Sequence, residues 1–403
     1  MIPFSPPRID QKIIDEVIET LKSGWITTGP KTKLFEKKLQ EYTNSKRCLC
    51  LNSATAGLEL ILRWFGVKPG DEVILPAYTY CATANVVIHC GATPVFADIC
   101  DDFNIDIKDV ANKLTERTKV IIPVDICGLP CDYDELNSLI NNNKNLFTPE
   151  NEEQKKLGRV LLLSDSAHSI GAIYDNKKLG TQSDVSVFSF HAVKNLTTAE
   201  GGAISFNLPN TFDCEEIYNK LCIKSLHGQN KDALSKLKKG SWRYDIIEAG
   251  YKWNMTDIQA AIGLIELERY DSDMLVKRKQ IFDKYTESFS KYSWAKLPIT
   301  INNKKETSYH VYPLRINGIN EDTRDSIISE IFEQEVSVNV HFIPLPLMSF
   351  YKSLGYNIKD YPVAYKNYSQ EISLPVYYDL RDQDIEKVIN AVVSAVESKK
   401  NNL

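Results

Sequence analysis

Short apolar runs alternate with amphipathic stretches along the first two-thirds of the chain. Two of the runs, residues 120–124 and 160–163, are continuously apolar, which is typical of strands that are buried on both faces of a sheet. Helical patterns lie between most of them, for example over residues 56–65 and 81–89. We expect strands at residues 73–75, 94–97, 120–124, 160–163, 185–190 and 202–206. This order predicts an α/β fold with a mostly parallel, doubly wound sheet.

The last third of the chain predicts a smaller α+β part. A long amphipathic helix over residues 256–291 would lead into it, and strands at 310–316 and 337–342 and a helix at 382–399 would follow. Residues 141–158 are polar without a clear period, so we expect a surface insertion there. The predicted organisation is a large domain of residues 1–265, with an N-terminal arm, and a small domain of residues 266–403.

The composition narrows the classes of function. The net charge is −5 and no long basic tract occurs, so nucleic acid is not an expected partner. The nine cysteines include no Cys-x-x-Cys pair with a matching second pair, which argues against a zinc ribbon or a disulfide framework and fits reduced thiols. A signal-peptide pattern is missing, and no apolar stretch approaches the roughly 20 residues that span a bilayer. We expect a cytoplasmic protein with no bound metal and no contact with a membrane.

The segment FSFHAVKNLTTAEGG, residues 188–202, places Lys194 in a loop at the end of a predicted strand. The carboxyl ends of strands are where α/β proteins bind ligands. An isolated lysine in such a loop would simply be solvated. Here the neighbouring hydroxyl groups and glycines, which allow close approach of a phosphate, favour a ligand site.

The segment LSDSAHS, residues 163–169, places Asp165 at the end of the most apolar run. A carboxylate leaving a buried strand needs a positive or hydrogen-bonding partner. One interpretation is a helix N-cap, because Asp and Ser are preferred there. The other is a carboxylate that faces a pyridinium nitrogen and keeps it protonated. The segment alone leaves both open.

Two weaker motifs lie upstream. Residues 52–58, NSATAGL, bring small and hydroxyl side chains into the start of a helix, whose free N–H groups can bind phosphate. Many helices start in this way. Residues 76–80, PAYTY, place aromatic rings after a strand, where one could stack on a flat heterocycle, although core packing is commoner.

In this order and spacing, the four motifs resemble the DegT/DnrJ/EryC1/StrS family of sugar aminotransferases, among the aspartate-aminotransferase-like enzymes that use pyridoxal phosphate. The resemblance starts at SGWITTGP, residues 23–30, continues through GYKWNMTDIQAA, residues 250–261, and ends at ISLPV, residues 372–376. The string SFHxxKNLTTxEGG is its most distinctive part. The resemblance implies fold type I, with a large cofactor-binding domain and a smaller C-terminal α+β domain.

The resemblance also implies roles for individual residues. Lys194 takes the place of the lysine that forms the Schiff base, and Asp165 that of the aspartate that pairs with the pyridine nitrogen. His168 takes the place of a Gln or His near the phenolic oxygen, and Tyr80 that of the stacking aromatic. The phosphate-binding set corresponds to Ser189, Ser53, Ala54 and Thr55.

One departure concerns the partner subunit. Many members read Gly-Tyr-Asn-x-Arg-Met, and the Asn reaches the cofactor phosphate of the neighbouring subunit in a homodimer with shared active sites. Here Lys252 stands at the Asn place and Asn254 at the Arg place, so either could make that contact. The Lys-aromatic-Asn pattern of residues 252–254 resembles that of the branch of the family that forms 4-amino-arabinose.

The implied reaction transfers an amino group, from glutamate, to a nucleotide-linked keto-sugar through pyridoxal 5'-phosphate and pyridoxamine 5'-phosphate. A 4-keto sugar carried by UDP or dTDP is favoured, for a surface polysaccharide such as lipopolysaccharide.

Lysine attacks a carbonyl only when neutral, and burial beside a cationic ring would lower the pKa of Lys194. Arg243 lies in a predicted loop, where its guanidinium group could bind the diphosphate of the substrate. A solvated surface charge is an equally good interpretation of this arginine. The candidate substrate residues are Trp25, Thr28, Arg243, His310 and His341.

Four alternatives remain open. The acceptor could be a 3-keto sugar or a cyclitol ketone. A few relatives dehydrate a deoxysugar at C3, but those carry a histidine where this chain has Lys194. A non-catalytic ligand sensor would predict damage at Lys194 or Asp165, and neither residue is replaced.

Overall fold

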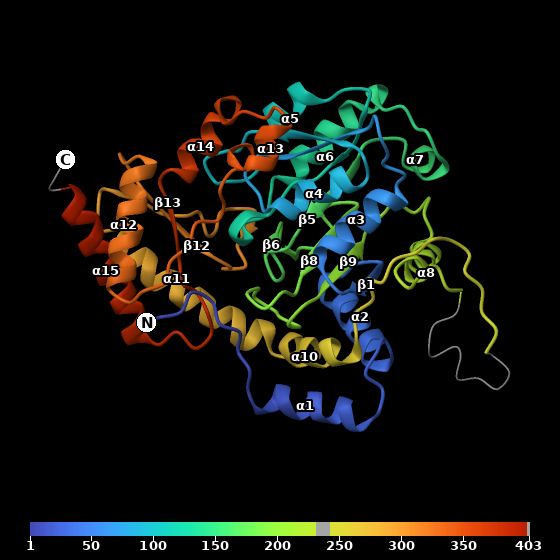
Figure 1. The fold of residues 1–403 in the computed structure, drawn as a ribbon, viewed down its shortest axis with the longest axis horizontal. Helices are drawn as coiled ribbons and strands as arrows, with labels where there is room; N and C mark the ends of the chain where they lie inside the picture. Colours follow the sequence, from blue (N-terminus) through green and yellow to red (C-terminus); the bar gives the residue numbers. More distant parts are fainter. Residues whose placement is uncertain (231–241, 401–403) are drawn as a thin grey trace.

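The computed structural model describes residues 1–230 and 242–400, and it is built around a central sheet of seven strands (Figure 1). The strand order is β1-β9-β8-β5-β4-β2-β3. All neighbouring pairs from β8 to β3 are parallel, whereas β9 runs antiparallel to both β8 and β1. The strands are β1 Arg47–Leu51, β2 Glu72–Pro76, β3 Thr93–Ala97, β4 Thr118–Ile121, β5 Leu161–Asp165, β8 Val185–Ser189 and β9 Gly202–Phe206. The predicted α/β class and the mostly parallel sheet are confirmed.

Helices cover this sheet and contribute most of its connections. The helix α3 packs against β8 and β9, α4 packs against β2 and β3, and α2 packs against β1 and β9. The helix α1 lies outermost, against α10, which in turn packs on α2 (Figure 1). These helices are α1 Gln11–Lys22, α2 Pro30–Thr43, α3 Ala54–Trp64, α4 Cys81–His89, α5 Ile107–Lys113, α6 Tyr133–Asn142, α7 Glu152–Leu157, α8 Cys214–Lys224 and α10 Asp257–Glu268. Among the described residues, no helix is both long and apolar enough to cross a bilayer.

A second, three-stranded antiparallel sheet forms in the last third of the chain. Its strands are β10 Ala295–Lys296, β12 Tyr312–Ile316 and β13 Glu371–Leu374. Apolar side chains of these strands and of the surrounding helices form their own hydrophobic cluster, and Ile2 joins it by pairing with Val336. The helices are α11 Leu275–Phe289, α12 Glu321–Glu333, α13 Ser349–Ser353, α14 Pro362–Tyr368 and α15 Asp382–Lys400. A third small sheet joins β11 Lys305–Glu306, β6 Ile173–Tyr174 and β7 Lys177–Lys178. The domain boundary at residues 265 and 266 stays a prediction.

The polar segment 141–158 contains more structure than its sequence indicates. It holds a 3-10 turn, Lys144–Leu146, and the helix α7. The side chain of Gln154 is buried and donates a hydrogen bond of 2.9 Å to the carbonyl oxygen of Phe65. Asn151 caps α7 and donates to the same oxygen at 3.0 Å. The polar residues therefore satisfy the end of α3, which a hydrophobic period cannot reveal.

Two further expectations are wrong in detail. The predicted helix 256–291 is two helices, α10 and α11, separated by a π-helical turn over Tyr270–Met274. Tyr270 is fully buried there, and its hydroxyl donates to the carbonyl oxygen of Ile170 at 2.8 Å. The predicted strand 337–342 is absent: among the described residues it contributes only one bridge pair, between Asn339 and Ser373. The Asn339 side chain accepts the backbone N–H of Val340, which diverts the chain from a ladder.

The topology brings the sequence motifs to one edge of the central sheet. The strand β5 ends at Asp165 and its parallel neighbour β8 ends at Ser189. Because parallel strands present their carboxyl ends at the same edge, the loops that carry His168 and Lys194 emerge side by side. The strand β2 runs in the same direction and ends just before the segment of Tyr80.

Candidate active site

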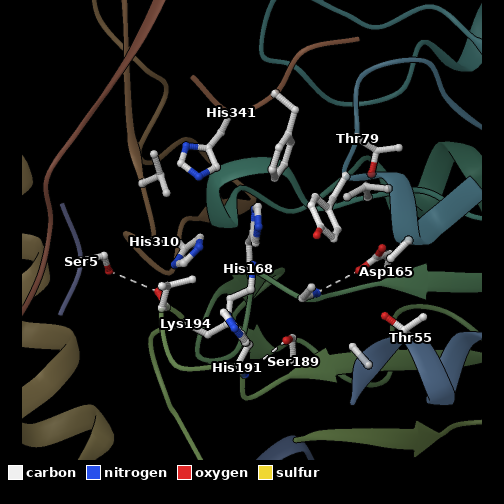
Figure 2. Close-up of a pocket in the computed structure, with 18 of the residues that line it drawn as sticks. Ser5, Thr55, Thr79, Asp165, His168, Ser189, His191, Lys194, His310 and His341 are labelled. Carbon is white, nitrogen blue, oxygen red and sulfur yellow. Dashed lines mark hydrogen bonds between the residues drawn. The ribbon is translucent and has the colours of Figure 1, made fainter. Parts of the chain in front are cut away.

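A cavity of about 450 Å³ lies at this edge, between the central sheet and residues 310–311, 341–342 and 374–376 of the last third of the chain (Figure 2). A volume of this size suits a small-molecule ligand. The cavity brings together ten of the predicted site residues, namely Lys194, Asp165, His168, Ser189, Ser53, Ala54, Thr55, Tyr80, His310 and His341. In Figure 2, His310 and His341 lie on one side, Asp165 and Thr55 on the other, and His168 between them.

The amine of Lys194 is the reactive group that this cavity offers. Its backbone N–H bonds to the carbonyl oxygen of His191 at 2.9 Å, which folds the loop after β8 into a turn. Burial lowers the pKa of Lys194 to about 8, because the charged ammonium loses water, while the charge of Asp165 acts in the opposite direction. A larger share of this lysine is therefore neutral and nucleophilic at physiological pH than of an ordinary lysine.

The Asp165 carboxylate is held in place by two hydrogen bonds. It accepts from the hydroxyl of Thr83 at 2.8 Å and from the backbone N–H of Ala167 at 3.2 Å. Burial raises the pKa of Asp165, and both hydrogen bonds act against that shift. The bond to Ala167 resembles a cap, yet Asp165 lines the cavity, so the carboxylate is available to a cationic ligand.

A second buried carboxylate, Asp125, supports the loop beneath Asp165 and was missed in the sequence. It accepts hydrogen bonds from the hydroxyls of Ser169 at 2.8 Å, Tyr133 at 2.8 Å and Ser166 at 3.1 Å. These bonds anchor the loop between Asp165 and His168 to the neighbouring strand end. The available signal was its position: a charged residue directly after the apolar run 120–124.

Two histidines of the cavity, His168 and His310, are neutral, and their hydrogen bonds define their tautomers. Burial lowers the pKa of both His168 and His310. The Nδ1 of His168 accepts the backbone N–H of Cys127 at 3.2 Å, so its proton resides on Nε2. The Nδ1 of His310 lies 2.7 Å from the Oδ1 of Asn195. The amide nitrogen of Asn195 donates to the carbonyl oxygen of Ser308, so Oδ1 accepts and His310 carries its proton on Nδ1.

The start of α3 forms the anion-binding corner of the cavity. Ser53 caps the helix and accepts the backbone N–H of Ala56 at 3.1 Å. The first N–H groups of the helix, at Ala54 and Thr55, have no acceptor within the helix. A Cβ at Gly202 would lie 2.4 Å from the nitrogen of Ala54, so the sheet and the helix start touch without space for a side chain. This corner fits a phosphate.

Three aromatic rings, those of Tyr80, Phe342 and Phe4, contribute to the apolar wall of the cavity. Tyr80 precedes α4, is 61% exposed and lies 5.9 Å from the ring of Phe342. A tyrosine this exposed is not part of the core, so its ring is available for stacking on a flat ligand. Phe4 stacks on His341 at 5.4 Å, and the hydroxyl of Ser5 donates to the carbonyl oxygen of Val193 at 3.3 Å. The N-terminal segment thus closes one side of the cavity.

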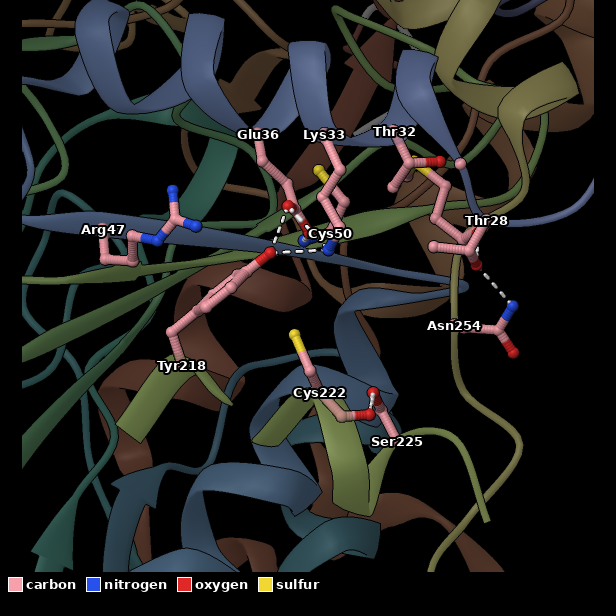
Figure 3. Close-up of polar contacts among 12 residues, drawn as sticks. Thr28, Thr32, Lys33, Glu36, Arg47, Cys50, Tyr218, Cys222, Ser225 and Asn254 are labelled. Atoms are coloured by element: carbon pink, nitrogen blue, oxygen red, sulfur yellow. Dashed lines mark hydrogen bonds and ion pairs between the residues drawn. The ribbon is translucent and has the colours of Figure 1, made fainter. Parts of the chain in front are cut away.

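The remaining five predicted residues, Trp25, Thr28, Lys252, Asn254 and Arg243, lie outside the described lining of this cavity. Thr28 and Asn254 are hydrogen bonded at 2.7 Å and line a second cavity of about 300 Å³ (Figure 3). The indole N–H of Trp25 donates to the carbonyl oxygen of Thr28. Lys252 and Arg243 are exposed. Part of the loop before Arg243, residues 231–241, falls outside the described residues.

Comparison with known proteins gives a consistent result. Residues 7–393 match the model of the DegT/DnrJ/EryC1/StrS aminotransferase family. The structure of the putative sugar aminotransferase Spr1654 from Streptococcus pneumoniae, solved in PMP and PLP forms, superposes with a TM-score of 0.95 for the PMP form, at 46% identity over 99% of this chain and 100% of that one.

Two relatives have more specific names. The spore coat polysaccharide biosynthesis protein SpsC of Bacillus subtilis is 37% identical over 98% of this chain and 97% of its own. The UDP-4-amino-4-deoxy-L-arabinose–oxoglutarate aminotransferase of Shewanella sediminis is 31% identical over 99% of each chain.

Proposed function

Because the chain belongs to the DegT/DnrJ/EryC1/StrS aminotransferase family, we propose that it transfers the amino group of glutamate to the 4-keto group of a nucleotide-linked sugar. Membership of the family establishes the general activity: the protein is a sugar aminotransferase that depends on pyridoxal phosphate. The UDP-linked 4-amino sugar and the oxoglutarate in the name of the Shewanella relative support the finer assignment. The name of the Bacillus relative supports a role in polysaccharide synthesis.

The observation that carries the proposal is the arrangement of Lys194, Asp165 and the start of α3 around one cavity. The amine of Lys194 would hold the aldehyde carbon, and the carboxylate of Asp165 would face the ring nitrogen. The corner at Ala54 and Thr55, with the hydroxyl of Ser189, would receive the phosphate. When bound, pyridoxal phosphate withdraws electrons from the amino-bearing carbon and makes its C–H bond acidic.

The side chains of the protein supply the proton transfers. Lys194, with a pKa of about 8, can both accept and release a proton near neutral pH, which is the condition for a general acid–base catalyst. Asp165 holds a negative charge on the side of the cavity opposite His310 and His341, and this charge favours a protonated ring nitrogen. His168 presents its Nε2–H, a donor that suits a phenolate oxygen. Tyr80 would cover the face of the ring.

Lys194→Ala tests the assignment of the amine. We expect the purified variant to remain folded, to lose the visible absorbance of the lysine-bound cofactor and to lose turnover with glutamate. Lys12→Ala, at an exposed surface position on α1, is the matched control and should behave as wild type. Transamination by Lys194→Ala at the wild-type rate would show that the assignment is wrong.

Asp165→Asn separates binding from chemistry. The amide keeps the shape of the side chain, so cofactor binding should persist. Turnover should fall by about 10²-fold or more, because the ring nitrogen no longer faces a negative charge. An unchanged turnover number would contradict the role of Asp165.

The identity of the acceptor is tested by a panel of ketones. UDP- and dTDP-linked 4-keto sugars, a 3-keto sugar nucleotide and a cyclitol ketone would each be incubated with glutamate, and the product analysed by mass spectrometry. We expect amination of a 4-keto sugar nucleotide. Faster amination of the 3-keto sugar or the cyclitol would replace the proposed substrate class while leaving the aminotransferase activity in place.

We also propose that two copies of the chain share their active sites. Lys252 and Asn254 lie outside the cavity of their own chain, as expected if they serve a partner. Inactive Lys194→Ala would be mixed with the double variant Lys252→Ala, Asn254→Ala under conditions that exchange subunits. Each mixed dimer would hold one intact site, so activity should recover to about a quarter of wild type. No recovery, with exchange verified by mass, would refute the shared site.

A further inference from the structure

A chain of hydrogen bonds leads from the cavity to a buried carboxyl group. The Nδ1 of His341 lies 2.9 Å from the hydroxyl oxygen of Ser373, and that hydroxyl lies 2.5 Å from Oε1 of Glu371. The other oxygen of Glu371 accepts the backbone N–H of His341 at 3.1 Å. Glu371 and Ser373 are two residues apart on β13, so both side chains point to the same face of the strand.

This chain of hydrogen bonds leads from the interior of the protein to the cavity. His341 lines the cavity and is visible on its wall in Figure 2. Glu371 and Ser373 are fully buried. The ring of His341 is therefore the outer end of the chain and Glu371 is the inner end.

Counting protons shows that the chain has two states. If Glu371 is ionised, the single hydroxyl proton of Ser373 goes to the carboxylate, and His341 must donate its Nδ1–H to the serine oxygen. The Nε2 of His341 then carries a lone pair. If Glu371 is protonated on Oε1, each bond in the chain reverses, and His341 carries its proton on Nε2. The protonation of a buried carboxyl group thus selects the tautomer of a cavity residue.

We propose that His341, Ser373 and Glu371 form a proton relay that deprotonates the ammonium group of the incoming amino donor. The inference rests on the proposed transamination, in which an amino acid must present a neutral amine before it can attack the carbon that Lys194 would hold. His341 is the candidate catalytic residue because it lines the cavity. Ser373 and Glu371 act through it and are positioning residues.

The relay balances in protons and charge. An N–H bond of the donor ammonium breaks as a proton binds Nε2 of His341. The Nδ1–H of His341 passes to the oxygen of Ser373, and the hydroxyl proton of Ser373 passes to Glu371. The donor becomes a neutral amine, the carboxylate becomes a neutral acid, and the positive and negative charges cancel without an added reactant.

The surroundings of Glu371 favour a carboxyl group that exchanges protons near neutral pH. Two arginines lie near it, but the hydrogen bonds that they donate go to groups other than its carboxyl group. Arg324 donates to Asp325 and to the carbonyl oxygens of Tyr368 and Glu371, and Arg315 donates to Asp101 and Asn367. Burial raises the pKa of Glu371 to about 8. The hydrogen bonds from Ser373 and from the backbone of His341 act against this shift, and so do the charges of the two arginines.

His341 itself does not retain the proton. Burial lowers the pKa of this imidazole to about 3, and the charge of Lys194 acts in the same direction. The other titratable groups that face the relay are His168, His310, Tyr78 and Cys127. His168 and His310 are held neutral, and burial raises the pKa of both Tyr78 and Cys127, so none of the four carries a competing charge at neutral pH. Glu371 is thus the group in which the proton comes to rest.

Nuclear magnetic resonance of the full chain without cofactor tests the wiring directly. Selective ¹⁵N labelling of histidine distinguishes protonated from bare ring nitrogens, and the loss of signals in His341→Gln assigns this residue. Wild type should carry the His341 proton on Nε2 at about pH 6 and on Nδ1 at about pH 10, with a midpoint near the pKa of about 8 that burial confers on Glu371. A tautomer that stays constant over this range would overturn the proposal.

Two variants make the test specific. In Glu371→Gln, the amide oxygen would accept the backbone N–H of His341 and the amide NH₂ would donate to Ser373, which locks the proton on Nε2 at every pH. Ser373→Ala removes the link, so the tautomer should no longer follow Glu371. Ser369→Ala is the matched control: this serine is also buried and close to β13, but it bonds to the carbonyl oxygen of Lys366. A pH-dependent tautomer that persists in Glu371→Gln and Ser373→Ala would refute the relay.

Kinetics with glutamate then test the use of the relay. In wild type, kcat/KM for the donor should rise with pH as Glu371 ionises. At about pH 9, Glu371→Gln and Ser373→Ala should lose about 10²-fold in kcat/KM for the donor, together with that inflection. Retention of the wild-type pH profile by both variants would overturn the proposal. The resonance experiment contains no substrate, so failure of the proposed reaction and failure of the relay are distinguishable.

Discussion

The titration of Lys194 gives the most quantitative expectation from this structure. Burial lowers its pKa from 10.5 to about 8. At pH 7, a lysine with a pKa of 10.5 is neutral in about 0.03% of molecules, and one with a pKa of 8 in about 9%. The cavity therefore increases the neutral amine by about 300-fold. A neutral electrophile should modify Lys194 of the cofactor-free protein at neutral pH far faster than the exposed lysines.

The assay is dinitrophenylation over a pH series, with peptide mass spectrometry to follow Lys194 and to use the remaining lysines as an internal reference. The rate at Lys194 should reach half of its plateau near pH 8. Asp165→Asn sharpens the test, because the charge of Asp165 opposes the effect of burial. In this variant the midpoint should move below that of wild type. An unchanged or higher midpoint in Asp165→Asn, or a wild-type midpoint near 10, would refute the reasoning.

Three further outcomes are expected. Gly202→Ala should weaken cofactor binding by at least about tenfold, because its Cβ would lie 2.4 Å from the nitrogen of Ala54; a spectroscopic titration measures the affinity, and unchanged binding would contradict the proposed phosphate corner. Tyr218→Phe should lower the free energy of urea unfolding by about 1–3 kcal/mol, because its hydroxyl bonds buried Glu36 at 2.7 Å and the Lys33 ammonium at 2.6 Å (Figure 3); a smaller loss would show that Lys33 and the backbone N–H of Cys50 satisfy Glu36 without Tyr218. Glu371→Gln should reduce the dependence of the unfolding free energy on pH. Between pH 4.5, the ordinary pKa of a glutamate, and about 8, folded wild type holds a proton on Glu371 that the unfolded chain releases, so the unfolding free energy of wild type falls by up to about 5 kcal/mol as pH rises. Urea unfolding measured over this pH range gives that free energy for both proteins, and the same pH dependence in both would contradict the raised pKa of Glu371.

The central sheet was predictable because its strands are buried on both faces. Runs such as residues 120–124 and 160–163 consist of apolar residues alone, without polar alternation. The broken helix at Tyr270 was not predictable, since the hydrophobic period continues across the π-helical turn, and the hydroxyl of Tyr270 bonds there to Ile170 and Asn195, which are distant in the sequence. Polar contacts between distant segments, such as Gln154 with Phe65, likewise have no local signature.

The candidate site was predictable where the chemistry depends on residue type at the end of a strand. A ligand at Lys194 was predictable because hydroxyl groups and glycines accompany it in a loop at a strand end. The segment of Asp165 left a helix cap equally open, and the resemblance to the family assigned the roles of Asp165 and His168. Asp125 and Glu371 were not identified, because their partners are side chains and backbone groups that only the fold brings near. For Trp25 and Arg243 the sequence indicated ligand contact, and the structure places neither at the cavity.

The path of the first five residues has a practical consequence for anyone who engineers this enzyme. Ile2 is tied to Val336, Phe4 covers the ring of His341, and Ser5 bonds to the loop of Lys194. Trimming this segment would therefore remove Phe4 and Ser5 from the cavity wall, and a purification tag fused ahead of Met1 would start only a few residues before them. Fusions belong at the opposite terminus, after the α15 helix.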